Sequence, residues 1–126
     1  MTRHLFDAFR IGLPGCEIVA LTDISTGTVL AWSAALKWPQ DDVDALCALA
    51  GRMLDLGSDT RSGALTPHAV IVQPTGTYVI VRAAPDRPEA LCCILAPGAA
   101  LDTVIATMMR FCADLAAGAA SDKGAT

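Results

Sequence analysis

Short links between apolar runs constrain the fold of this chain more than any other feature. Residues 68–73, 77–82 and 90–95 are rich in Val, Ile, Leu and Cys, a composition typical of buried strands. The links between them, 74–76 and 83–88, are shorter than the crossover of about a dozen residues that parallel neighbours need. We therefore expect these three strands to pair in an antiparallel arrangement.

A second hairpin is predicted nearer the N-terminus, where residues 17–22 and 28–33 are again rich in apolar and β-branched side chains. Asp23 can hydrogen bond to the backbone of its own turn, and Gly27 can adopt a positive φ angle. These two residues predict a loop of about four or five residues between antiparallel strands. Together with the first three strands, the hairpin makes one five-stranded, mostly antiparallel sheet.

Three helices are predicted around this sheet. Residues 3–11 have apolar side chains at helical spacing and are followed by Gly and Pro, which end helices. Residues 39–56 begin with Pro and several Asp residues, which favour the start of a helix. Residues 99–117 form the last helix. The predicted order is α-β-β-α-β-β-β-α, an α/β (α+β) fold with helices on both faces of the sheet.

The chain is predicted to be a single domain with a short tail. Its 126 residues suffice for one hydrophobic core, and residues 1–117 show no repeat or internal boundary. Residues 118–126 are small and polar, and we expect them to form a flexible C-terminal tail. No stretch approaches the roughly 20 apolar residues that span a bilayer, and the first residues do not resemble a signal peptide. We expect no membrane insertion and a cytoplasmic location.

Charge and reactive side chains argue against several functions. The net charge of −4, with no basic stripe, argues against nucleic acid as a partner. The five cysteines form an odd set without CxxC, and neither His4 nor His68 has a Cys or carboxylate at ligand spacing, so no metal site is indicated. The adjacent Cys92 and Cys93 point to opposite faces of a strand. With no nucleophile beside a base and no phosphate-binding loop, we expect no cofactor and no enzymatic activity.

The predicted helix over 39–56 is apolar around more of its circumference than one sheet requires. Its apolar arc covers about 180°, whereas packing on one sheet needs little more than about 100°. The arc consists of a first stripe, Val43, Cys47, Ala50 and Leu54, and a second stripe, Leu46, Leu49, Met53 and Leu56. One of these stripes can pack on the sheet of this chain, and the other is then left for a partner, most simply another copy of the chain in a homodimer. The alternative is that another layer, or the loop over 57–66, covers it within one chain.

Two more residues of this region are candidate partner contacts. Trp38 stands directly before Pro39 at the start of the helix, and Trp is frequent among the residues that dominate binding energy at interfaces. The alternative is that Trp38 only packs the start of the helix onto the sheet. Arg52 lies in the polar sector of the same helix.

Several local features resemble the roadblock (dynein light chain) superfamily. In that family an opening helix leads through a Pro-Gly step into a strand, a turn with Asp and Gly, and a strand with a Val-Leu-Ala-like run. The matching residues here are Pro14-Gly15, Asp23, Gly27 and Val29-Leu30-Ala31. The resemblance covers about residues 3–117. This chain departs from the family pattern in its short opening helix, in its longer Asp-to-Gly turn and in the loop over 57–66, which has no family signature.

The resemblance implies a function. Family members are non-enzymatic and pair through the middle helix and the third strand, which extends one sheet across a dimer. The implied dimer interface here contains Leu46, Leu49, Met53, Val70 and Val72. Bacterial members regulate or scaffold Ras-like small GTPases, so the resemblance implies such a GTPase as partner. The alternative is a small-molecule sensor of the profilin-like or PAS-like type, in which the sheet and a helix enclose a ligand cavity.

Overall fold

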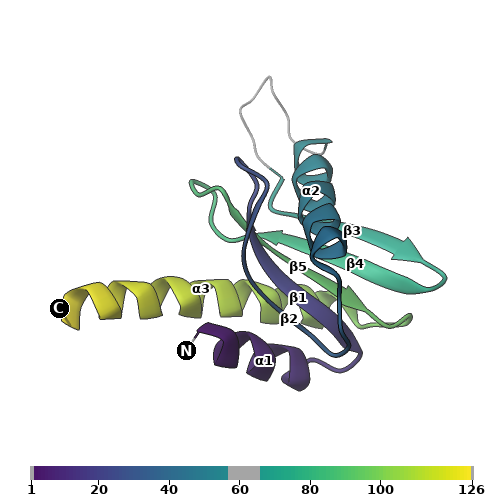
Figure 1. Ribbon diagram of the computed structural model, residues 1–126, viewed down its shortest axis with the longest axis horizontal. Coiled ribbons are helices and arrows are strands. Elements are labelled where there is room, and N and C mark those ends of the chain that lie inside the picture. The colour runs from purple at the N-terminus through teal and green to yellow at the C-terminus, as the bar shows by residue number, and fades with distance from the viewer. Residues whose placement is uncertain (1, 57–65, 126) are drawn as a thin grey trace.

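The structure is a computed structural model that describes residues 2–56 and 66–125, and the surroundings of side chains over 4–55 and 66–118. The order of its elements is the predicted one, and the predicted loop over 57–66 lies, apart from Thr66, outside the described residues. The elements are α1 (Thr2–Gly12), β1 (Cys16–Asp23), β2 (Thr28–Ala34), α2 (Gln40–Leu56), β3 (His68–Gln73), β4 (Gly76–Arg82), β5 (Glu89–Leu95) and α3 (Leu101–Ala125) (Figure 1).

The strands form one sheet with the order β2-β1-β5-β4-β3. All four neighbouring pairs are antiparallel, which confirms the predicted pairing. β5 is the central strand, because it pairs with β1 of the first hairpin on one side and with β4 of the second on the other. The two edges of the sheet are therefore β2 and β3.

The turn between β1 and β2 has the chemistry that its sequence predicts. Asp23 Oδ1 accepts a hydrogen bond from the Ser25 backbone N–H at 2.9 Å, and Gly27 has a φ of 72°, a conformation that costs glycine little. The Gly27 N–H closes the turn on the Asp23 carbonyl at 2.8 Å. β2 also contains an extra residue near Leu30, where its register with β1 shifts.

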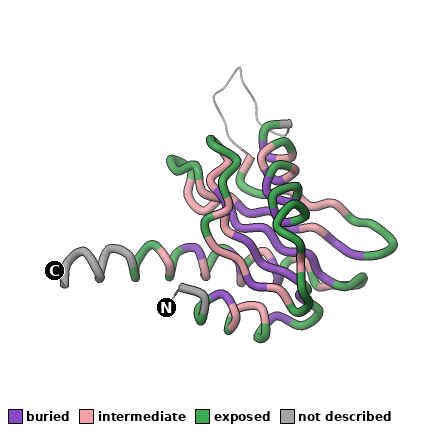
Figure 2. The backbone as a smooth tube through the Cα atoms, in the orientation of Figure 1, coloured by how far each residue is buried: buried purple, intermediate pink, exposed green. Residues whose placement is uncertain are grey.

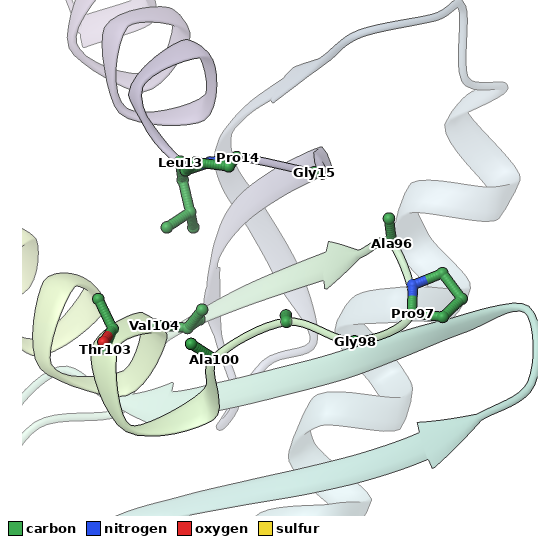
Figure 3. Close-up of a pocket in the computed structure, with 10 residues that line it drawn as sticks. Leu13, Pro14, Gly15, Ala96, Pro97, Gly98, Ala100, Thr103 and Val104 are labelled. Carbon is green, nitrogen blue, oxygen red and sulfur yellow. The ribbon is translucent and has the colours of Figure 1, made fainter.

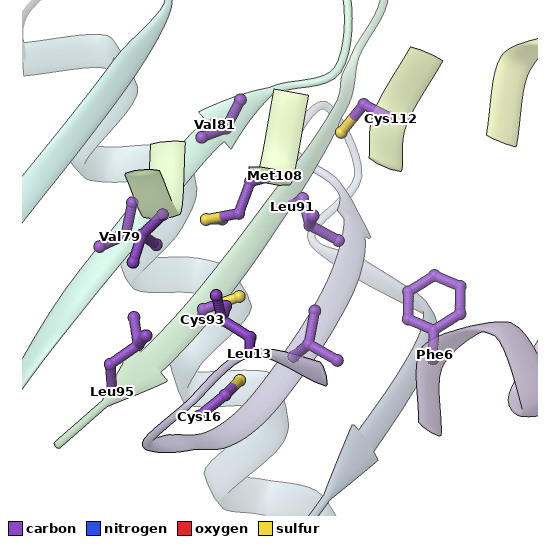
Figure 4. Close-up of a cluster of buried hydrophobic side chains, with 12 residues drawn as sticks. Phe6, Leu13, Cys16, Val79, Val81, Leu91, Cys93, Leu95, Met108 and Cys112 are labelled. Atoms are coloured by element: carbon purple, nitrogen blue, oxygen red, sulfur yellow. The ribbon is translucent and has the colours of Figure 1, made fainter. Parts of the chain in front are cut away.

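The helices cover both faces of the sheet, as predicted. α2 lies across one face, and α1 and α3 lie side by side on the other (Figure 1). The buried backbone is concentrated in the central strands between them (Figure 2). The core under α1 and α3, called the α1–α3 core, consists of Phe6, Leu13, Cys16, Val19, Val79, Val81, Leu91, Cys93, Leu95, Val104, Met108 and Cys112 (Figure 4).

The core on the other face, called the α2 core, contains smaller side chains. It consists of Ile18, Ala20, Val43, Leu46, Cys47, Ala50, Leu54, Ile80, Ala90, Cys92 and Ile94. Alternate residues of β1, β4 and β5 enter opposite cores because successive side chains of a strand point to opposite faces. The central strands therefore bury both of their faces.

Ser33 connects α1 to the edge strand β2. It is buried, and its hydroxyl donates a hydrogen bond to Asp7 Oδ1 and accepts one from Arg10 Nε at 2.9 Å. Hydrogen bonds to charged groups contribute more to stability than neutral ones. The charged groups of Asp7 and Arg10 are therefore both hydrogen bonded within the chain.

α3 continues farther than the sequence predicts. It ends at Ala125, whereas its predicted end is residue 117. The physical reason is that a single glycine, Gly118, costs a helix only about 1 kcal/mol relative to Ala, and two alanines follow it directly. Flexibility of 118–126 remains a prediction. Within the described ranges, no helix combines the length and hydrophobicity that crossing a bilayer requires.

Substitution of one buried and one exposed leucine tests the position of the core. Leu91 is 0% exposed in the central strand, whereas Leu36 is 79% exposed. We expect Leu91→Ala to lower the free energy of unfolding by about 2–5 kcal/mol, since it leaves a cavity, and Leu36→Ala to change it by less than about 0.5 kcal/mol. Urea denaturation followed by circular dichroism measures both. Equal effects of the two substitutions would contradict the buried position of β5.

Candidate protein-interaction surface

The first stripe of α2 packs on this chain's own sheet. Val43, Cys47, Ala50 and Leu54 are all buried in the α2 core. The opposite, polar sector of the helix faces solvent, with Asp44, Arg52 and Asp55 exposed. The structure thus decides a point that the sequence leaves open, because it is the first stripe that packs completely on the sheet.

The second stripe is partly covered within one chain, contrary to the expectation that it is left for a partner. Leu46 is only 4% exposed and belongs to the α2 core, whereas Leu49 and Met53 are half-buried. The reason is that α2 lies across a twisted sheet, so that side chains on its flank still reach the strands beneath. The side chain of Leu56 lies outside the described residues. The open part of the stripe is thus narrower than its sequence suggests.

A shallow groove runs along the flank of α2 that carries the second stripe. Its volume is about 310 Å³. Tyr78 of β4 and Ile94 of β5 form its floor and lie opposite each other in the sheet. The groove is lined by Trp38, Asp42, Ala45, Leu46, Leu49, Tyr78 and Ile94. Since Tyr78 also pairs with Ile71 of β3, the groove lies toward the β3 edge of the sheet.

Val70 and Val72 lie on the face of the sheet opposite to α2. Val70 packs against the α1–α3 core, and Val72, two residues along the strand, points the same way and is 72% exposed. The candidate interface residues are therefore not one patch but two, on opposite faces. Both patches flank the same edge strand, β3, which pairs with β4 and with no other strand of the described chain.

Trp38 and Arg52 occupy different surroundings. Trp38 is half-buried, packs against the α2 core and lines the groove, so it packs the start of α2 onto the sheet while part of its side chain stays accessible. Arg52 is exposed on α2. Sequence reasoning missed Tyr78 and Ile94 as groove residues, because a strand pattern does not reveal which buried residue lies beside a helix flank.

The exposed side of α2 is acidic. Asp41, Asp42, Asp44 and Asp55 are exposed there together with one cation, Arg52. Negative potential of this kind favours approach of a partner with a basic surface.

Four of the five buried cysteines form two thiol pairs, one in each core. As predicted, Cys92 and Cys93 point into opposite cores. Each has a thiol partner that the sequence did not reveal: the Cys92 thiol hydrogen bonds with that of Cys47 of α2, and the Cys93 thiol with that of Cys16 of β1. These hydrogen bonds lower the pKa of Cys16 and Cys47, whereas contact with the partner thiol and burial raise the pKa of Cys92.

Burial also governs the thiols of the α1–α3 core. It raises the pKa of Cys112 to about 11 and, as the largest cause, the pKa of Cys93. Thiols with raised pKa values are poor nucleophiles because the thiolate is the reactive form. Among the described residues, no group of three or more His, Cys, Asp or Glu side chains is arranged to hold a metal ion. The five thiols serve as core side chains.

A larger hollow lies where the turns before β1 and after β5 meet (Figure 3). It has a volume of about 410 Å³ and is lined by Leu13, Pro14, Gly15, Ala96, Pro97, Gly98, Ala99, Ala100, Thr103 and Val104. Thr103 supplies the one side-chain hydroxyl of this lining. A small-molecule site usually combines apolar walls with several convergent polar groups. This hollow does not, so it gives no support to the sensor alternative.

Comparison with known proteins identifies the fold. The sequence matches neither a model of a known family nor a curated protein. Among solved structures, a Roadblock/LC7 domain from Streptomyces avermitilis matches with a TM-score of 0.77 at 15% identity, over 90% of this chain and 92% of that one. MglB from Myxococcus xanthus matches with a TM-score of 0.73 at 15% identity, over 94% of each chain.

A third match is an MglB described with a tetrameric arrangement, with a TM-score of 0.69 at 20% identity, over 90% of this chain and 83% of that one. At such identities the similarity establishes the fold. The chain therefore has the roadblock fold, as its sequence resemblance predicted.

The raised pKa of Cys112 gives a measurable reactivity. With a pKa of about 11, its thiolate fraction at neutral pH is far below that of a free cysteine. We expect iodoacetamide to alkylate Cys112 of the folded protein at least about a hundredfold more slowly than in the unfolded protein, and the rate to rise about tenfold per pH unit up to about pH 10. Peptide mapping by mass spectrometry measures the rate. A plateau near pH 9 would contradict the assignment.

Proposed function

We propose that this protein is a non-enzymatic, homodimeric adaptor or regulator that binds a Ras-like small GTPase, or a complex containing one, in the cytoplasm. The observation that carries the dimer is the open β3 edge, flanked on both faces by apolar surface. The GTPase follows from the roadblock fold together with the family resemblance of the sequence, in which bacterial members regulate such GTPases.

β3 is the better of the two sheet edges for pairing with a second copy. An edge strand presents unpaired N–H and C=O groups to any strand that can align with it. The other edge, β2, has a register shift near Leu30, and such irregularities hinder pairing. The register of β3 with β4 is regular from His68 to Gln73. A second β3 would therefore extend the sheet without distortion.

Pairing through β3 would bury both apolar patches together. On one face, the helix α2 of the second copy would approach the groove that contains Leu46, Leu49 and Tyr78. On the other face, Val70 and Val72 would meet their counterparts, since cross-strand neighbours on one face lie within contact distance. The division of the candidate interface between two faces is thus compatible with one continuous interface. The similar MglB that is described with a tetrameric arrangement is in keeping with assembly beyond one chain.

The acidic outer side of α2 supports a protein partner with a basic surface. Its carboxylates, among them Asp44 and Asp55, outnumber its single exposed guanidinium, Arg52. Complementary charge raises the rate of association between proteins. We therefore place the GTPase contact on this side of α2, where Arg52 is exposed. Trp38 lines the groove that the dimer would cover, so its contact would be with the second copy.

Substitutions at the proposed β3 interface and at the opposite edge, β2, distinguish specific pairing through β3 from non-specific association. We expect Val72→Glu and Met53→Glu to raise the dissociation constant of the dimer by about a hundredfold, because each introduced charge is buried twice in a two-fold interface. Leu30→Glu is the matched control, since Leu30 is 51% exposed at the opposite edge. Light scattering after size-exclusion chromatography should show half the wild-type mass for the first two variants only. A wild type of 13.0 kDa in solution would overturn the dimer.

Binding of the GTPase is tested with purified components. Ras-like GTPases from the cells that contain the protein are loaded with GDP or with a non-hydrolysable GTP analogue and titrated onto the immobilised protein. We expect binding in one nucleotide state and an association rate about tenfold lower for Asp44→Lys. The charge-matched control is Asp86→Lys, in the exposed turn before β5. Failure of every such GTPase to bind in both states would contradict the proposal.

A further inference from the structure

α1 and α3 lie side by side on the face of the sheet away from α2 (Figure 1). A second groove lies between them, lined by residues of both helices. Its volume is about 360 Å³, and its lining is Leu5, Ala8 and Phe9 from α1 and Phe111, Asp114 and Leu115 from α3. The proposed dimer through β3 does not use this groove, because α1 covers the part of the sheet that includes β2, the opposite edge.

The walls of the groove are apolar and preformed. Phe9 and Phe111 stack with their ring centroids 4.5 Å apart, and Phe6 lies with its ring centroid 5.2 Å from that of Phe111 in a T-shaped arrangement. Phe9, Phe111 and Leu115 are nevertheless only half-buried, and Leu5 is 53% exposed. Rings that are held in place while one side stays exposed lose little entropy when another surface covers them.

Two opposite charges lie one helical turn apart on the exposed side of α3, called the rim, and of the two only Asp114 lines the groove. Asp114 is exposed and lines the groove, and Arg110 is exposed one helical turn before it. Within the described part of the chain neither has an ion-pair partner. Residues 110 and 114 are equally distant along the helix from residue 112. If two α3 helices pack antiparallel with a two-fold axis at that level, Arg110 of each copy faces Asp114 of the other.

The charges at this rim balance each other. The chain has a net charge of −4, and the outer side of α2 carries an excess of carboxylates. Beside the groove, by contrast, Arg110 and Asp114 balance, and Asp7 and Arg10 of α1 are both hydrogen bonded to Ser33. Like charges placed opposite each other weaken an interface, so local neutrality favours self-association here.

We propose that the α1–α3 groove binds a second copy of this chain, with α3 against α3 about a two-fold axis and two Arg110–Asp114 ion pairs at the rim. Leu5, Phe9 and Phe111 supply the apolar centre of this contact, and the charges set its register. Together with pairing through β3, the contact builds a dimer of dimers. It does not depend on the β3 dimer or on the GTPase, because the groove lies away from the β3 edge and from the outer side of α2.

Charge reversal with rescue tests the contact. We expect the wild type to have the mass of four chains at tens of micromolar, and Arg110→Asp or Asp114→Arg alone to halve it, since each creates two like-charge contacts. The double variant Arg110→Asp/Asp114→Arg exchanges the partners and should restore the wild-type mass. Sedimentation velocity measures all four proteins. Both residues are exposed, so folding is preserved, which circular dichroism verifies.

Two further variants distinguish this contact from the one at β3. Asp102→Arg is the control for charge on the same helix, because Asp102 is exposed but does not line the groove, and it should leave the mass unchanged. Val72→Glu should also halve the mass, and combining it with Arg110→Asp should give monomers. If the double charge exchange fails to restore the mass, or if the single reversals leave it unchanged, the contact is overturned. A wild type no larger than two chains whose mass only Val72→Glu reduces also overturns it and leaves the β3 dimer intact.

Discussion

The central strand β5 is the constraint on which the rest of the structure depends. Its residues from Ala90 to Leu95 are buried, because β1 and β4 flank it and helices cover both of its faces. Its pairing with β1 joins segments about seventy residues apart in the chain. Without that pairing, the two hairpins would be separate and neither could bury its apolar faces.

Burial of the central strands determines which apolar surfaces stay exposed. Most large apolar side chains are buried in the two cores of the chain. The cysteines, which could be reactive groups on the evidence of the sequence, are buried there as well, four of them as thiol pairs. What stays open lies at the margins: the β3 edge with its flanking patches, and the groove between α1 and α3. The hollow near the Pro14 and Pro97 turns is apolar and lacks the polar groups of a ligand site. The apolar surface that stays exposed on the described chain is therefore at these margins and not in an enclosed ligand cavity.

The outer side of α2 and the rim of the α1–α3 groove differ in charge. The outer side of α2 is acidic, whereas the rim of the α1–α3 groove carries balanced charges. Proteins steer partners by complementary charge and reject wrong ones by like charge. An acidic face for a different partner and a neutral face for a second copy are compatible with one assembly, because they lie on opposite faces of the sheet (Figure 1).

The sequence by itself determined the elements, because their signals are local. Short links predict antiparallel hairpins, Asp23 and Gly27 predict the turn between β1 and β2, and the apolar periodicity of residues 39–56 predicts a helix with one of two stripes on the sheet. Only the tertiary structure decided the pairing of β1 with β5, the burial of Leu46, the placing of Val72 on the face opposite α2, and the groove between α1 and α3. These features depend on which distant segments meet and at what angle, and side-chain periodicity contains no information about either.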